Sequence, residues 1–82
     1  MAKTSYREAV RSHVVRLIRE ERQAKGISMT RVAEKAGVSQ GMISLFEAEL
    51  RNPSLDTLLR ICGALQIDLS KILTKAERAA AK

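Results

Sequence analysis

The sequence predicts a compact all-α domain of five helices, and three observations support this fold class. Hydrophobic residues make up 45% of the 82 residues but only two residues are aromatic, so the core must consist mainly of aliphatic side chains. Apolar residues recur at the spacing of helices, and the alternation typical of strands is absent. Ser, Thr, Gly and Pro stand at the points where such helices would begin and end.

The first predicted helix begins at the Ser/Thr pair Thr4 and Ser5 and ends at Gly26. Glycine is a suitable stop because it enters the left-handed conformation beyond a helix end without a steric penalty. Steps of three and four residues place the apolar side chains of this helix in one stripe. The stripe consists of Tyr6, Val10, Val14, Leu17 and Ile18.

The next two predicted helices are short and lie close together in the chain. Ser28 is placed to cap a helix over 29–36, which Gly37 ends. After one linker residue, Ser39 is placed to cap a helix over 40–49. Serine is favoured at these positions because its hydroxyl accepts a hydrogen bond from a free backbone N–H in the first turn.

Pro53 separates the third predicted helix from the fourth, because proline cannot continue a helix. Ser54 can cap the fourth helix, and Asp68 can cap a short fifth helix that contains Ile72 and Leu73. The apolar positions of the fourth helix are Leu55, Leu58, Leu59, Ile61, Cys62 and Leu65.

A single domain is predicted over residues 1–82, with its core between about residues 6 and 73. The remaining segment, 74–82, contains Thr74 and Glu77 at the spacing of a capping box, so it can start a helix. It offers almost nothing to bury, however, and we therefore expect this tail to fray.

The net charge of +6 and the isoelectric point near 10.1 suggest a polyanionic partner, most often a nucleic acid. The charge is unevenly distributed along the chain. Residues 1–27 hold seven basic and three acidic side chains, and residues 54–82 hold five and three. Residues 28–53 hold three of each, so the basic excess flanks the central segment.

Composition also excludes several classes of function. His13 is the only histidine and Cys62 the only cysteine, so the chain has no intramolecular disulfide and no multi-cysteine zinc site. We expect Cys62 to be a core thiol, and we expect neither an enzyme nor a bound cofactor or metal. Without a run of about 18 apolar residues or an apolar segment like that of a signal peptide, a cytoplasmic protein is expected.

The segment 29–49 has the spacing of a helix-turn-helix. This motif needs a small residue inside its first helix, a residue that tolerates positive φ at the turn, and aliphatic residues after the turn and inside the second helix. Ala33, Gly37, Val38 and Ile43 meet these requirements in that order. Together they favour a helix-turn-helix, whose second helix would present its N-terminal end to DNA bases, over an arbitrary helical hairpin.

The chain resembles the Cro/repressor-type helix-turn-helix family of phage repressors, restriction–modification controller proteins and antitoxins. The similarity extends from about Val14 to Leu73 and includes the patterns S-x-x-x-V-A-x-x-A-G-V-S, R-N-P-S and L-x-x-I-x-x-A-L-x-I. The resemblance implies a lambda-repressor-like five-helix fold, no catalysis, and a homodimer on palindromic double-stranded DNA. It also implies a partly buried ion pair between Arg22 and Glu47, which would tie the first helix to the third.

Four positions depart from the family. Met29 stands where glutamine is frequent, Leu45 where a polar or basic residue contacts DNA, Glu49 where glycine ends the helix, and Leu50 where lysine or arginine is frequent. These changes remove candidate phosphate contacts and add one repulsion. An alternative to DNA binding is therefore a protein-interaction module that keeps the fold, since exposed apolar clusters often mark protein contacts. Its partner, a toxin or a polymerase for example, is not identified by the sequence.

DNA binding remains the favoured function, because backbone N–H groups at helix starts can bind phosphates. The amide of Gln40 can match adenine as a bidentate pair, Gly41 would allow close approach, and Leu45 can contact a thymine methyl group. The predicted DNA-binding residues are Thr30, Arg31, Ser39, Gln40, Gly41, Ser44, Leu45, Arg51 and Asn52. Basic residues of the first helix that would flank this site are Arg7, Arg11, Arg16, Arg19 and Lys25. The expected dimer contacts are Ile67, Leu69 and Leu73.

Overall fold

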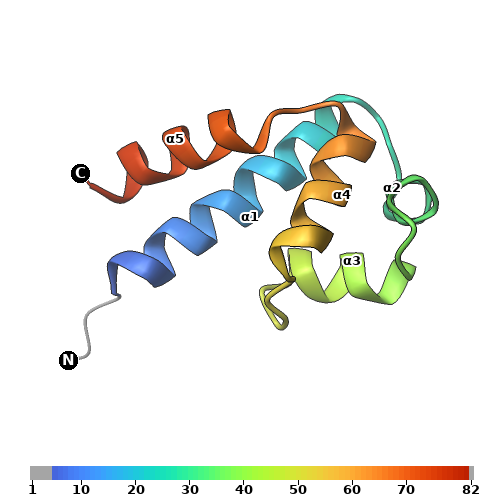
Figure 1. Ribbon diagram of the computed structural model, residues 1–82, viewed down its shortest axis with the longest axis horizontal. Helices are drawn as coiled ribbons and strands as arrows, with labels where there is room; N and C mark the ends of the chain where they lie inside the picture. Colours follow the sequence, from blue (N-terminus) through green and yellow to red (C-terminus); the bar gives the residue numbers. More distant parts are fainter. Residues whose placement is uncertain (1–4, 82) are drawn as a thin grey trace.

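The computed structural model describes residues 5–81, which form five α-helices. Residues 1–4 and Lys82, which belong to the predicted start of the first helix and to the tail, lie outside the described residues. The helices are α1 (Tyr6–Ala24), α2 (Met29–Ala36), α3 (Gln40–Glu47), α4 (Leu55–Leu65) and α5 (Leu69–Ala80). Helices α1 and α5 lie side by side, and α4 stands between this pair and the α2–α3 pair (Figure 1). The predicted all-α, five-helix fold is confirmed.

Four of the five helices begin at a serine cap, as predicted. In each case the hydroxyl accepts a hydrogen bond of 3.1 Å from the backbone N–H three residues later, which satisfies one of the free N–H groups of the first turn. Asp68 occupies the same position before α5 but makes no capping bond; its carboxylate lies 3.6 Å from Lys71 Nζ instead. The capping serines are Ser5, Ser28, Ser39 and Ser54.

Helices α1 to α4 each end in a residue with positive φ: Gly26, Gly37, Glu49 and Gln66. After α3, the N–H of Glu49 bonds to the carbonyl of Phe46 (3.0 Å) and the N–H of Leu50 to that of Leu45 (2.9 Å), which is the Schellman pattern. Helix α3 thus ends at Glu47, two residues before the predicted end. Glu49 adopts φ +60°, a conformation that costs a residue with a Cβ roughly 1–2 kcal/mol relative to glycine.

The core extends from the contact of α5 with α1 and α4 to the contact of α1 and α4 with the α2–α3 pair, and its residues are aliphatic apart from Phe46 and Cys62. Phe46 is 2% exposed, and burying a side chain of this size contributes about 1.5–3 kcal/mol. Ala33 and Ala36 on α2 are also buried, which lets α2 and α3 cross closely. The largest fully buried side chains are Phe46, Ile18, Ile43, Ile61, Leu65 and Val32.

Helix α5 is longer than the sequence predicts. It continues from Leu69 to Ala80, and Ala76 is completely buried, so the expectation that the tail frays is wrong. Thr74 lies inside this helix, where its hydroxyl donates to the carbonyl of Ser70, four residues earlier. A methyl side chain at position 76 lets α5 lie close along α1, its most extensive helix contact. Across residues 5–81, no helix combines the length and apolar character needed to cross a membrane.

The close crossing of α2 and α3 predicts the effect of enlarging Ala33. Ala33→Leu should lower the free energy of unfolding by roughly 1–3 kcal/mol, because three more carbon atoms have no space at a position only 4% exposed. Urea denaturation followed by circular dichroism measures the change. An unchanged midpoint would show that the crossing can relax and that Ala33 does not set it.

The buried thiol of Cys62 predicts a pH dependence. Burial raises the pKa of Cys62 to about 11, since the thiolate is poorly solvated in the core. The unfolded chain ionises at a lower pH than the folded chain, so the thiol should destabilise the fold progressively as pH rises from the ordinary thiol pKa towards 11. Urea titrations at several pH values should show a steeper loss for the wild type than for Cys62→Ala. Equal losses would contradict the prediction.

Candidate nucleic-acid interface

An ion pair between α1 and α3 supports the candidate interface from inside the molecule. Arg22 Nε lies 2.7 Å from Glu47 Oε2, and its Nη2 donates to Glu47 Oε1 at 3.0 Å, so the two groups form a bidentate pair. The two side chains are 12% and 7% exposed. Arg22 Nη1 also donates to the carbonyl of Ile27 at 2.9 Å. One guanidinium therefore connects α1, the turn before α2 and the C-terminal end of α3.

Three further contacts from α1 hold the end of α3 and the loop that follows it. Arg19 reaches the carbonyl of Glu47 (3.5 Å), and Ser12 donates to the carboxylate of Glu49 (2.6 Å). Arg11 Nη1 donates to the side-chain oxygen of Asn52 at 3.2 Å. Arg11 and Arg19 were expected only as flanking charges, and the sequence suggested no role for Ser12. No local pattern could have revealed these contacts, because they join residues 28 to 41 positions apart.

The exposed face of α3 contains the residues predicted to contact bases. Gln40, Gly41 and Ser44 are exposed on the first turns of the helix, while Ile43 is buried behind them. A Cβ placed on Gly41 would meet only Ser39 Oγ, at 3.9 Å. Packing within the chain therefore does not require glycine there. The structure thus places a polar, sterically open face at the N-terminal end of α3.

The remaining predicted contacts surround this face. Thr30 and Arg31 are exposed in the first turn of α2, and the guanidinium of Arg31 lies 4.0 Å from Glu34. Ser39 is exposed too, but its hydroxyl oxygen already caps α3 by accepting from Met42 N–H. Arg51 is exposed in the α3–α4 loop, and no hydrogen bond or ion pair holds it within residues 5–81.

Leu45 and Leu50, the two apolar departures from the family, are 38% and 75% exposed. They are the third residue before and the second residue after the C-cap Ala48, the positions that commonly contact each other in a Schellman motif. The turn thus offers a reason internal to the chain for their apolar character. The exposed part of the Leu45 side chain can still contact a bound partner.

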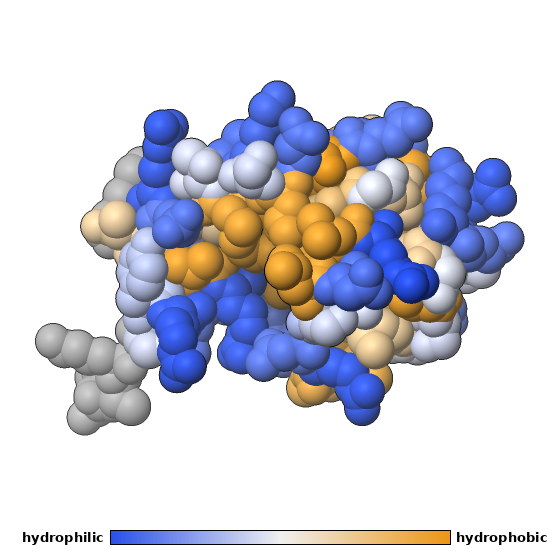
Figure 2. Space-filling view, in the orientation of Figure 1, coloured by the Kyte–Doolittle hydropathy of each residue, from blue (hydrophilic) through white to orange (hydrophobic). Residues whose placement is uncertain are grey.

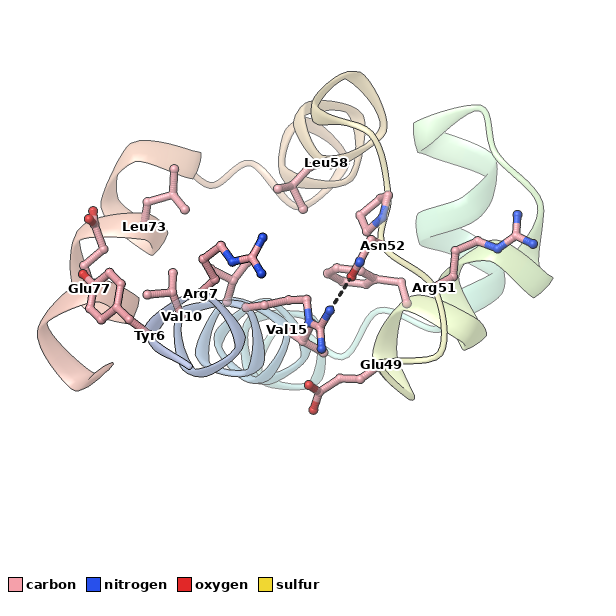
Figure 3. A pocket seen from close by; sticks show the side chains of 14 residues that line it. Tyr6, Arg7, Val10, Val15, Glu49, Arg51, Asn52, Leu58, Leu73 and Glu77 are labelled. Atoms are coloured by element: carbon pink, nitrogen blue, oxygen red, sulfur yellow. Dashed lines mark hydrogen bonds between the residues drawn. The ribbon is translucent and has the colours of Figure 1, made fainter. Parts of the chain in front are cut away.

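Not every basic residue of α1 lies near this face. Arg16 pairs with Glu20 and contacts His13 on its own helix. Lys25 donates to the carbonyl of Leu65 and so caps the C-terminal end of α4. Arg11, by contrast, donates to Asn52 in the α3–α4 loop, and Arg7 lines the hollow that Asn52 also lines (Figure 3). Only part of the predicted basic flank therefore accompanies the candidate interface.

The residues expected to form a dimer interface are largely occupied within the chain. Leu69 is 9% exposed, and Ile67 and Leu73 are half-buried against the core. Glu21, for which the sequence suggested no role, is half-buried and lines a shallow hollow with Ile67 and Lys71. The turn between α4 and α5 therefore offers little apolar surface to a partner.

A protein-family model described as helix-turn-helix matches residues 18–72, which include α2, α3, α4 and the ion pair. The chain belongs to this helix-turn-helix family. It is 41% identical over 56 residues to a putative HTH-type transcriptional regulatory protein of Methanocaldococcus jannaschii, covering 68% of this chain and 18% of that protein. The chain spans between 18% and 60% of the length of the curated relatives it first matches.

Two solved structures share the fold over most of the chain. The clp gene regulator ClgR from Corynebacterium glutamicum superposes with a TM-score of 0.78 and 28% identity, covering 88% of this chain and 77% of that one. A variant of the restriction–modification controller protein C.Esp1396I, bound to its highest affinity operator site, gives 0.78 and 23%, covering 90% and 97%. The predicted family is confirmed, and its named relatives are transcriptional regulators rather than enzymes.

The buried ion pair predicts a large effect from a single truncation. Arg22→Ala should lower the free energy of unfolding by about 3 kcal/mol, because Glu47 would keep a poorly solvated charge without its partner. Arg16→Ala is the matched control: its pair with Glu20 is 41% and 55% exposed and should contribute less than about 1 kcal/mol. Urea denaturation of both variants measures the difference. Similar losses for the two would mean that the Arg22–Glu47 pair is effectively solvated.

Proposed function

We propose that this chain is a sequence-specific DNA-binding transcriptional regulator that binds a palindromic operator as a homodimer in the cytoplasm. The observation that most supports this function is the exposed polar face at the N-terminal end of α3, backed by a buried ion pair at its C-terminal end. Membership of the helix-turn-helix family and the operator-bound state of C.Esp1396I agree with it. No catalytic or cofactor chemistry is part of the proposal.

In this function α3 lies in the major groove and Gln40 contacts a base edge. The side-chain oxygen of Gln40 can accept a hydrogen bond from the adenine N6 amino group while its amide nitrogen donates to adenine N7, which makes a bidentate match to adenine. Gly41 lets the backbone approach because nothing projects from it. Ser44, one turn further along the same face, is within reach of the next bases or phosphates.

Phosphate binding would come from the edges of the motif. The first turns of α2 and α3 present backbone N–H groups, which favour anions, near Thr30 and Ser39. Arg51 in the loop is free to bind a phosphate, whereas Asn52 is already oriented by Arg11. Since residues 28–53 have no net charge, we expect weak non-specific binding.

A homodimer fits this arrangement because one recognition helix covers only one half-site. Two copies related by a twofold axis would place their α3 helices about one helical turn apart, roughly 34 Å, on a palindrome. The second copy doubles the contacts without requiring a more basic surface. This matters for a motif that supplies few phosphate contacts of its own.

The alternative function is a protein-interaction module, and the exposed Leu45 and Leu50 favour it. The Schellman turn gives these side chains a role within the chain, which weakens that argument. The salt dependence of binding distinguishes the two functions. DNA binding should fall steeply with salt because counterions are released, whereas an apolar protein interface should not.

The proposed roles predict different behaviour for two exposed residues. Gln40→Ala removes one bidentate contact in each half-site, so it should weaken binding to a selected operator by roughly 1–3 kcal/mol for each half-site. Binding to scrambled DNA should stay nearly unchanged. Arg51→Ala should weaken binding to both DNAs alike and reduce the slope of log affinity against log salt by about one unit per copy. Fluorescence anisotropy over a salt series measures both effects.

Each outcome assigns a role. If Gln40→Ala loses affinity equally on the operator and on scrambled DNA, Gln40 contacts the backbone and another residue specifies the sequence. If the wild type shows no salt-dependent binding to any DNA, the DNA-binding function is wrong and the protein-interaction module is favoured.

A further inference from the structure

The loop between α3 and α4 is held to the rest of the molecule by few polar contacts. Its residues 51–53 have no regular secondary structure, and no backbone hydrogen bond reaches them within residues 5–81. In that part of the chain, the one hydrogen bond to this segment comes from α1, where Arg11 Nη1 donates to Asn52 Oδ1 at 3.2 Å. The position of the Asn52 side chain therefore depends on a residue 41 positions earlier.

Pro53 stiffens the backbone of the same segment. The proline ring fixes its own φ, and its Cδ restricts the preceding residue, Asn52, to extended conformations. Pro53 also lines the groove of about 510 Å³ that lies between α1, α4 and α5, next to Phe46 and Leu58. The backbone of Asn52 is thus confined without hydrogen bonds of its own. The direction of its side chain is what remains to be set, and the contact with Arg11 sets it.

The bond to Arg11 also determines which end of the Asn52 amide is free. A guanidinium has donors only, so the atom that faces Arg11 is the amide oxygen. The amide nitrogen carries two N–H donors, and neither has a hydrogen-bond partner among the residues that the structure describes. Arg11 therefore leaves Asn52 with a donating end exposed, which is the end that an anion requires.

The free amide lies on the same side of the molecule as α3. Helix α3 and the loop that follows it form one edge of the molecule (Figure 1). Figure 2 shows mostly hydrophilic side chains along this edge and hydrophobic ones across the middle of the face. Asn52 lines a polar hollow there with Arg7, Glu8 and Arg11, so two of the three charged neighbours are basic. An anion at this edge would meet a net positive charge and an oriented donor.

A second contact from α1 holds the carboxylate of the same loop. Ser12 Oγ donates to Glu49 Oε1 at 2.6 Å, so the residue that follows Arg11 binds the loop near its other end. Glu49 and Arg51 point in different directions from the loop (Figure 3). Glu49, which would repel a phosphate, is thus held on α1, whereas Arg51 is exposed and available to bind one.

We propose that Arg11 is a positioning residue for DNA binding, because it directs the amide nitrogen of Asn52 towards a backbone phosphate. The inference rests on the proposed function, and it adds how α1 prepares the α3–α4 loop for DNA. Asparagine amides are common phosphate ligands, and phosphate contacts fix the register of a protein on the duplex. A donor that is already oriented loses less conformational freedom on binding than a mobile one. Arg11 can therefore raise affinity without contacting DNA itself.

Asn52→Asp tests whether residue 52 binds a phosphate or only holds the loop. Aspartate keeps an oxygen that accepts from Arg11, and the contact becomes an ion pair, so the loop should stay in place. The variant loses both N–H donors and turns a carboxylate towards the phosphate. Affinity for a selected operator, measured by fluorescence anisotropy, should fall by more than about tenfold, and further than in Asn52→Ala. Wild-type affinity in Asn52→Asp would overturn the proposal.

A double-mutant cycle tests whether Arg11 acts through Asn52. Arg11→Ala and Asn52→Ala should each weaken operator binding about tenfold, and the double variant should lose no more than Asn52→Ala alone. Arg11→Ala should change the slope of log affinity against log salt by much less than one unit, because the amide contact that it disturbs carries no charge. Additive losses, or a slope lowered by about one unit, would show that Arg11 binds a phosphate directly and would overturn its positioning role.

Arg7→Ala is the matched control, since Arg7 carries the same charge one turn earlier on α1. Within residues 5–81 it makes no hydrogen bond or ion pair, so its removal should weaken binding less than Arg11→Ala does. Equal losses would mean that the charge of α1 matters and the bond to Asn52 does not. Unchanged urea midpoints would confirm that these exposed substitutions leave the fold intact.

The wild-type protein separates this inference from the proposed function. If it binds no DNA in a salt-dependent manner, the DNA-binding function is wrong and the role of Arg11 is wrong with it. If it binds the operator but Asn52→Asp binds equally well, or the losses in the cycle add, the DNA-binding function holds and the positioning role alone is overturned.

Discussion

The bidentate pair between Arg22 and Glu47 is the interaction on which the rest of the arrangement depends. Helix α3 has only eight residues, and a helix of that length is not stable alone in water. Its buried side supplies Ile43 and Phe46 to the core, and these apolar contacts hold the helix against the rest of the domain. A planar guanidinium that meets both carboxylate oxygens adds a directional contact at the C-terminal end of α3, and so helps to set the direction in which Gln40 points.

The same pair connects three parts of the chain. Arg22 also binds the carbonyl of Ile27, so the turn between α1 and α2 is held by the group that holds the end of α3. Around it, Arg11, Ser12 and Arg19 extend the contact of α1 along the loop that follows α3. The polar face of the candidate interface is thus positioned by α1, a helix that need not touch DNA bases itself.

Local rules predict most of the secondary structure in this chain. Serine caps and the glycines at positions 26 and 37 act through the backbone of their own helices, so the sequence alone predicts them well. The end of α3 was predicted two residues too late because Glu49 occupies a left-handed position that is unusual for a residue with a side chain. A long-range bond from Ser12 to its carboxylate helps to hold that conformation, and no local pattern reveals such a bond.

The tail and the exposed leucines show that side-chain packing, like long-range hydrogen bonds, cannot be predicted from local sequence patterns. An Ala-rich segment looks as though it has nothing to bury, yet Ala76 is completely buried because α5 lies close against α1. Leu55 and Leu59 fit the apolar pattern of α4, yet they remain exposed while Ile61, Cys62 and Leu65 turn inward. Sequence periodicity identifies an apolar face, but it does not distinguish a face that packs within the chain from one that a partner covers.

In the proposed function, the charge of the helix-turn-helix segment determines how strongly one copy of the chain can bind DNA. Residues 28–53 contain three basic and three acidic side chains, and only one of the acidic ones, Glu47, is neutralised by a buried partner. Each phosphate contact contributes a slope of about −0.9 in log affinity against log salt, so a single copy with few such contacts would bind DNA weakly at physiological salt. In the proposed function, two copies would add their contacts on a palindrome but would gain much less on unrelated sequences. Sequence preference would then depend on the dimer as much as on Gln40, because the neutral surface keeps non-specific binding low.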